Sequence, residues 1–168
     1  FETTYDFSAP GEYLITVYTE MNGDEDVLND TFNYYVVNRL VAPYFQDFEN
    51  WNGGWYVDTI SVNATWEFGT PNTLAIPAAA SGKNAWVTNL DGFYSNDELS
   101  YLHSPCFDFS DLTEDPAIEF SLIYDTELEY DGAWLEISTN EGQDWEKVGA
   151  IDEGINWYNF LNDNAALG

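Results

Sequence analysis

AIEFSLIYDTELEYDGAWLEISTNEGQDW, residues 117–145, is the stretch that decides the fold. Apolar side chains occupy every second position from Ile118 to Tyr124, and again from Ala133 to Ile137. This period of two is typical of a strand with one face in a core. The stretch therefore predicts two strands, separated by an acidic loop, in an all-β protein.

The loop between these strands carries acidic residues at alternate positions, namely Asp125, Glu127, Glu129 and Asp131. If the backbone stays extended, their carboxylates line one face, and no basic residue lies nearby in the sequence. Such crowded carboxylates must take up protons, spread into solvent or bind a cation, and an oxygen-rich cluster suits calcium best. The acidic loop is therefore consistent with two interpretations, a calcium-binding cluster and a solvated acidic face.

The charge balance of the chain excludes several classes of partner. Its 168 residues contain 31 acidic and three basic residues, with a net charge of -28. Nucleic acid and anionic membrane surfaces require a positive patch, which three basic residues do not supply. The aromatic content of 18% gives enough apolar area for a packed core, so this is not a disordered acidic tail.

Single residues exclude other kinds of site. Cys106 is the only cysteine, which excludes an intrachain disulfide, and its apolar surroundings predict a core thiol. His103 is the only histidine, which excludes a histidine-rich zinc site and favours a packing or hydrogen-bonding role. No apolar run approaches the roughly 20 residues of a membrane span. The chain opens at Phe1 in strand-like sequence, so we expect a piece of a longer protein.

The first forty residues predict a hairpin. Strands are expected over 12–20 and 31–38, with a polar turn at 22–26. The phrases Pro-Gly-Glu-Tyr at 10–13, Ile-Thr-Val at 15–17 and Asn-Asp-Thr at 29–31 resemble the end of immunoglobulin-like, CARDB-type repeats of bacterial surface proteins. This resemblance implies a partial immunoglobulin-like β-sandwich over residues 1–40, followed by a linker at 41–43.

The remaining residues, 44–168, predict short strands at intervals of about ten residues, which favours an antiparallel β-sandwich. Strands are expected over 66–71, 84–89 and 100–109. An ordered set of short sequence motifs in residues 44–168 resembles the MAM family of jelly-roll domains in its cysteine-free bacterial form. These motifs are Phe48-Glu49, Trp66 with Gly69-Thr70-Pro71, Gly82-Lys83-Asn84-Ala85-Trp86, Leu102-His103-Ser104-Pro105, and Phe120 through Asp131-Gly132-Ala133 and Leu135.

The MAM resemblance implies a non-catalytic jelly roll for adhesion or ligand binding, incomplete at its C-terminus. It also implies a structural calcium near the Phe48-Glu49 phrase, with Glu49 as a ligand and Asp91 and Asp131 as companions. Because the resemblance and the acidic loop both point to calcium, the predicted metal site comprises Glu49, Asp91, Asp125, Glu127 and Asp131.

Two further motifs have competing interpretations. Residues 138–145 are similar to the Asp-box hairpin, in which polar side chains hold a turn and a tryptophan packs beneath it, so a structural turn is favoured over sugar processing. Pairs such as Glu127 with Asp131 have the carboxylate chemistry of a glycosidase. Catalysis is disfavoured, however, because crowded acids give no reason for one pKa to differ usefully from the rest.

Tryptophans at strand spacing favour core positions, but seven exceed what one sandwich normally hides, so one or two exposed rings are candidates for a sugar-binding face. The predicted ligand-binding residues are Trp55, Trp66 and Trp134. Together the residues and resemblances predict a non-catalytic adhesion segment of a large secreted bacterial surface protein, stabilised by calcium, exported by the type IX route and linked to gliding motility. Its expected partners are a cell-surface polysaccharide or protein, neighbouring domains and secretion proteins. The alternative is an accessory carbohydrate-binding module of a secreted peptidase or polysaccharide-degrading enzyme.

Overall fold

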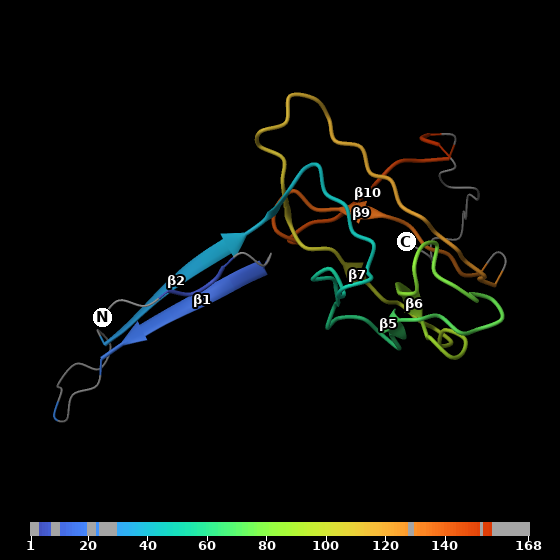
Figure 1. Ribbon diagram of the computed structural model, residues 1–168, viewed down its shortest axis with the longest axis horizontal. Helices are drawn as coiled ribbons and strands as arrows, with labels where there is room; N and C mark the ends of the chain where they lie inside the picture. The colour runs from blue at the N-terminus through green and yellow to red at the C-terminus, as the bar shows by residue number, and fades with distance from the viewer. Residues whose placement is uncertain are drawn as a thin grey trace. The chain divides into compact units, whose positions relative to one another are not determined.

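The computed structural model describes residues 4–7, 11–19, 23, 30–127, 130–151 and 153–155 (Figure 1). These residues form ten β-strands and no helix, which confirms the predicted all-β class. None of them belongs to a helix long and apolar enough to cross a membrane. The chain divides into two compact units, Phe1–Ser121 and Leu122–Gly168. The linker predicted at 41–43 and the two sandwich domains on either side of it stay predictions.

The longest element of the first unit is the hairpin of β1 (Gly11–Tyr18) and β2 (Thr31–Asn38) (Figure 1). The two strands pair antiparallel over eight residues, from Gly11 opposite Asn38 to Tyr18 opposite Thr31. Alternation and β-branched or aromatic residues predict both strands, and the structure confirms them. The predicted turn at 22–26 lies outside the described residues, apart from Gly23.

One face of this hairpin is apolar except at its end, where Gly11 lies opposite Asn38. The apolar part consists of three cross-strand pairs: Tyr13 with Val36, Ile15 with Tyr34, and Val17 with Phe32. Phe7 packs edge-on against Tyr13 at a ring-centroid distance of 5.1 Å and covers one end of the face. Much of the rest is exposed, because two strands alone do not bury a face.

Three further two-stranded sheets organise the rest of the first unit. β3 (Leu40–Val41) pairs parallel with β8 (Phe107–Asp108), and β4 (Tyr56–Val57) pairs antiparallel with β7 (Leu102–His103). β5 (Trp66–Gly69) pairs antiparallel with β6 (Ala85–Thr88). The strands β5 to β8 fall inside the predicted strand regions, but β7 and β8 are only two residues long each.

The core of the first unit lies against β5 and β6. Phe48 packs on Trp55 and Phe68 with ring-centroid distances of 5.7 and 6.3 Å, and Phe68 packs on Trp86 at 5.7 Å. Val87 of β6 is buried, with 5% of its surface exposed. These aromatic contacts hold the turn at 47–55 against the β5–β6 hairpin.

The second unit contains the hairpin of β9 (Glu136–Ile137) and β10 (Glu146–Lys147) (Figure 1). The bond from the Val148 N–H to the Leu135 carbonyl oxygen, at 2.8 Å, extends the pairing by one step. Only the end of the strand predicted from Ala133 to Ile137 is therefore formed.

Two predictions from sequence are wrong. Residues 117–125 form no strand, and their apolar side chains are exposed, because they take part in no β-ladder among the described residues and a strand requires one. Cys106 is exposed rather than buried. Its carbonyl oxygen accepts the Leu40 N–H at 2.9 Å, so its backbone is held beside β3, while its side chain stays exposed and the adjacent Phe107 is half-buried.

Candidate functional site

A tight turn presents Glu49, the first predicted metal ligand. The N–H of Phe48 donates to Gln46 Oε1 at 2.8 Å, and the N–H of Glu49 donates to Asp47 Oδ1 at 3.0 Å. Phe48 has a left-handed backbone, with φ of 62°. Side chains that bond to the backbone two residues later stabilise such turns locally, which is why this polar sequence turns here instead of continuing as a strand.

The Glu49 carboxylate contacts a loop more than thirty residues away. Its Oε1 accepts hydrogen bonds from the backbone N–H groups of Lys83 and Asn84, each at 2.8 Å. Gly82 has a φ of 58°, and a Cβ atom there would overlap the carboxylate. Consecutive backbone N–H groups directed at one point form an anion-binding nest. Glu49 therefore fastens the turn at 47–49 to the start of β6.

Asn52 makes a second connection between this turn and β6. Its Oδ1 accepts the Gly54 N–H at 3.1 Å, and its Nδ2 donates to the carbonyl oxygen of Trp55 at 3.1 Å. Its own carbonyl oxygen accepts the indole N–H of Trp86 at 3.1 Å. The segment around Phe48 and Glu49 is thus held by both polar and aromatic contacts.

Glu98 fastens two other loops to each other. Its carboxylate accepts the N–H of Thr65 at 3.0 Å and the N–H of Ser95 at 3.2 Å, and it accepts the hydroxyls of Thr65 and Ser100, each at 2.6 Å. Partial burial would raise the pKa of Glu98, but these hydrogen bonds outweigh it and lower the pKa below its ordinary value. Glu98 is therefore held in its charged form.

A histidine–aspartate pair joins β4 to β7. Nε2 of His103 lies 3.1 Å from Oδ2 of Asp58, and the exposed fraction of the His103 side chain is 12%. The imidazole stacks on the Tyr56 ring at 5.1 Å. Burial and the neighbouring Asp58 carboxylate raise the pKa of Tyr56. The predicted hydrogen-bonding role of His103 is confirmed, while sequence reasoning missed Asp58, which lies 45 residues away in sequence and has no motif.

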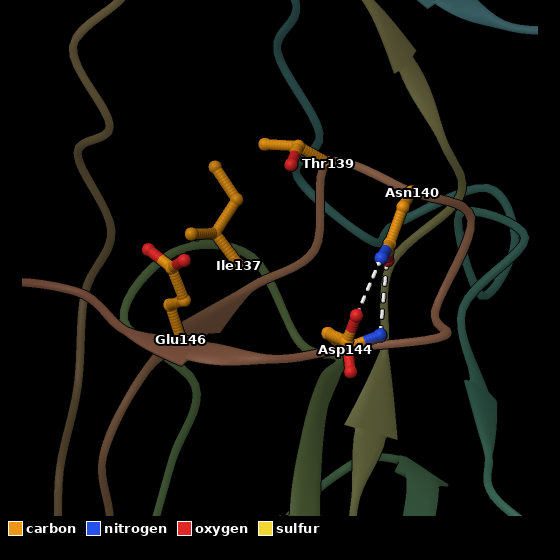
Figure 2. Close-up of a pocket in the computed structure, with 5 residues that line it drawn as sticks. All are labelled: Ile137, Thr139, Asn140, Asp144 and Glu146. Carbon is orange, nitrogen blue, oxygen red and sulfur yellow. Dashed lines mark hydrogen bonds between the residues drawn. The ribbon is translucent and has the colours of Figure 1, made fainter.

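A shallow hollow lies on the β9–β10 hairpin (Figure 2). Figure 2 shows Asn140 facing Asp144: Nδ2 of Asn140 donates to Oδ2 of Asp144 at 2.8 Å, and Oδ1 of Asn140 accepts the Asp144 N–H at 2.9 Å. Ser138 Oγ accepts the Gly142 N–H at 2.8 Å. An added Cβ at Gly142 would lie 3.6 Å from the Trp145 ring, so the indole packs under the turn. The predicted hydrogen-bonded turn is confirmed.

The predicted metal ligands do not gather in the described residues. No three histidine, cysteine, aspartate or glutamate side chains among these residues lie close enough to hold a metal ion. Asp91, Asp125, Glu127 and Asp131 are all exposed. The loop is not extended at its end, because the N–H of Asp131 donates to the carbonyl oxygen of Glu127 at 3.0 Å. Glu129 lies outside the described residues, and calcium binding stays a prediction.

The predicted sugar-binding tryptophans are half-buried. Trp55 and Trp66 have buried indole N–H groups without a hydrogen-bond partner in the described structure, and Trp134 donates its indole N–H to Glu136 Oε1 at 2.7 Å. The more exposed ring of the first unit is Trp51, with an exposed fraction of 46%. Ligand binding by these tryptophan rings stays a prediction.

Comparison with known proteins gives one relative. The chain is 30% identical over 130 residues to Bacillopeptidase F of Bacillus subtilis (strain 168), and the aligned region covers 77% of this chain and 9% of that protein. No protein-family model matches the chain. No solved structure matches it. The chain therefore corresponds to a small part of a much longer protein that is named as a peptidase.

Proposed function

We propose that this chain is an accessory, non-catalytic module of an extracellular peptidase and that it binds carbohydrate. The observation that carries the proposal is its 30% identity to Bacillopeptidase F over most of its own length but only 9% of that protein. A short all-β segment within a long peptidase suits an appended module better than a complete catalytic domain. The match supports this alternative over adhesion, and adhesion, type IX export and gliding stay predictions.

Trp51 is the best placed residue for contact with a sugar. It lies on the turn that Asn52 braces, and it is more exposed than the half-buried Trp55 and Trp66. A flat aromatic ring held on a rigid turn offers an apolar face to the C–H side of a sugar ring. Because the chain carries a net charge of -28, the ligand is expected to be a neutral or cationic polysaccharide.

The proposal is tested by co-sedimentation of the 168-residue chain with insoluble neutral polysaccharides, with Trp51→Ala and Phe93→Ala as a matched pair. Both side chains are exposed, so neither variant should unfold the chain. We expect Trp51→Ala to weaken binding about tenfold, corresponding to the loss of one ring contact, and Phe93→Ala to leave it unchanged. Equal binding by both variants, or no binding at all, would contradict the carbohydrate assignment.

A second measurement tests the non-catalytic part of the proposal. The purified chain is incubated with casein and with a panel of polysaccharides, and new chain ends are counted. No turnover is expected. Turnover that is lost in His103→Gln or Glu127→Gln would instead make this segment an enzyme.

A further inference from the structure

The corner where Glu49 meets residues 82–84 is the place where the jelly-roll resemblance implies a calcium ion. Calcium takes six to eight oxygen ligands. Two of the side-chain oxygens nearest in sequence already accept backbone hydrogen bonds, because Gln46 Oε1 accepts the Phe48 N–H and Asp47 Oδ1 accepts the Glu49 N–H. No three acidic, histidine or cysteine side chains gather here or elsewhere in the described residues. Within the described part of the chain, this corner therefore lacks the cluster of three carboxylates that would favour calcium, an ion that takes six to eight oxygen ligands.

The direction of the backbone N–H groups in residues 82–84 also disfavours the binding of a cation at Glu49. The N–H groups of Lys83 and Asn84 both point at Oε1 of Glu49, each with an N···O distance of 2.8 Å. A cation bound to that oxygen would lie beside the positive ends of two peptide dipoles. The same arrangement favours an anion, because successive N–H groups converge on it. Charge-assisted hydrogen bonds of this kind are stronger than those between neutral groups.

Gly82 shows that the loop is shaped around the carboxylate. Its backbone lies in the left-handed region, with φ of 58°, and an added Cβ would overlap Cδ, Oε1 and Oε2 of Glu49. Glycine is the residue that adopts this conformation at no steric cost and also leaves room for the side chain. We infer that the backbone of residues 82–84 is an anion-binding nest whose built-in ligand is the Glu49 carboxylate, in place of calcium at this corner. This inference does not depend on the proposed function.

Chemical rescue tests the nest. Glu49→Ala removes the internal ligand and should lower the melting temperature by roughly 5 °C, because two charge-assisted hydrogen bonds are lost. Sodium formate should then restore part of the loss, and more than sodium chloride at the same ionic strength does, because formate presents the same carboxylate to the two N–H groups. Glu119→Ala, at an exposed glutamate, is the matched control and should show no formate-specific recovery. An equal recovery of the melting temperature in formate and in chloride would contradict the inference that residues 82–84 form an anion-binding nest.

Calcium titration separates the nest from a metal site, and it uses Glu49→Gln, which keeps an oxygen acceptor and should fold. At fixed ionic strength, calcium should shift the melting temperatures of the unmodified chain and of Glu49→Gln equally. Amide N–H signals of Lys83 and Asn84 should move in Glu49→Gln and stay unchanged on calcium addition. A calcium-specific stabilisation that disappears in Glu49→Gln would overturn the inference and make Glu49 a metal ligand.

Discussion

At the scale of single residues, carboxylates in this chain serve as acceptors for backbone N–H groups. Examples among the described residues are Asp47, Glu49, Asp58, Glu67, Glu98 and Asp108. Three basic residues cannot neutralise 31 acids, so hydrogen bonding to the backbone is the main way in which an acid can contribute to this fold. The acids are thereby tied to turns and loops.

Replacement of Glu98 by glutamine should show this contribution. The amide of glutamine brings an NH₂ group to face donors from Thr65, Ser95 and Ser100, so at least one hydrogen bond is lost. We expect the free energy of unfolding at pH 7 to fall by about 1 kcal/mol, a value discounted for the partial exposure of this group. Urea denaturation measures the change, and Glu119→Gln is the control that should differ little from the unmodified chain.

We also predict that the stability difference between the unmodified chain and Glu98→Gln depends on pH. The folded state lowers the pKa of Glu98, so its contribution is present above the unfolded pKa of about 4.3 and is lost as the pH falls through the folded pKa. The difference in stability between the chain and Glu98→Gln should therefore shrink as the solution is acidified below pH 4. A difference that stays constant down to the lowest pH would show that the charge of Glu98 is not involved.

Tyr56 gives the folded state a stability that decreases, instead of increasing, as the pH rises, and this occurs at high pH. Because burial and Asp58 raise its pKa, the folded state favours the protonated phenol, and the stability that this supplies is lost as the pH rises from about 10 through the folded pKa. Spectrophotometric titration of the folded chain should show a late-titrating phenol that disappears in Tyr56→Phe. If Tyr56→Phe removes absorbance evenly across the titration, the raised pKa is wrong.

At the scale of elements, the hairpin of residues 136–147 is held by its turn more than by its two short strands. Asn140→Ala removes the bonds to both the side chain and the N–H of Asp144, and should loosen the packing of Trp145 under Gly142. We expect a red shift and loss of intensity in tryptophan fluorescence, and about 1 kcal/mol lower stability of the second unit. Thr139→Ala, at an exposed position in the same turn, should leave both readouts unchanged.

Local patterns predict the elements that depend on local interactions. The hairpin of β1 and β2, the strands β5 and β6, and the turn at 138–145 all follow from alternation or from side chains that bond a few residues away. The alternation at 117–125 is just as regular, yet it forms no strand because alternation does not supply a pairing partner. A pattern within one segment is therefore not sufficient for a strand in a sheet.

Contacts between distant segments are the part that the sequence does not predict. Glu49 bonds residues 34 and 35 positions away, Glu98 bonds Thr65 33 positions away, and Asp58 pairs with His103. Each contact joins common residue types without a recognisable spacing. The sequence predicts an extended acidic loop, but the bond from the Asp131 N–H to the Glu127 carbonyl oxygen shows that the loop is not extended at its end.

At the scale of the whole molecule, the net charge of -28 should govern solution behaviour. Repulsion among the carboxylates destabilises the compact state, and salt screens it over about 10 Å at 0.1 M. We expect the melting temperature to rise steadily when sodium chloride is raised from roughly 0.01 to 0.5 M, and to level off once screening is complete. Scanning calorimetry measures this, and a melting temperature independent of salt would contradict the account of self-repulsion.

The central claim, that carboxylates hold the loops by accepting backbone N–H groups, is tested most directly by a pH titration of amide chemical shifts. The N–H signals to follow are those of Lys83, Asn84, Leu90, Thr65 and Ser95, with the amides of the exposed residues 117, 118 and 121 as the reference. We predict that these five signals lie further downfield at neutral pH than in strong acid, because a charged carboxylate is the stronger acceptor, while the reference amides differ little. Five signals that titrate no more than the reference amides would contradict the account.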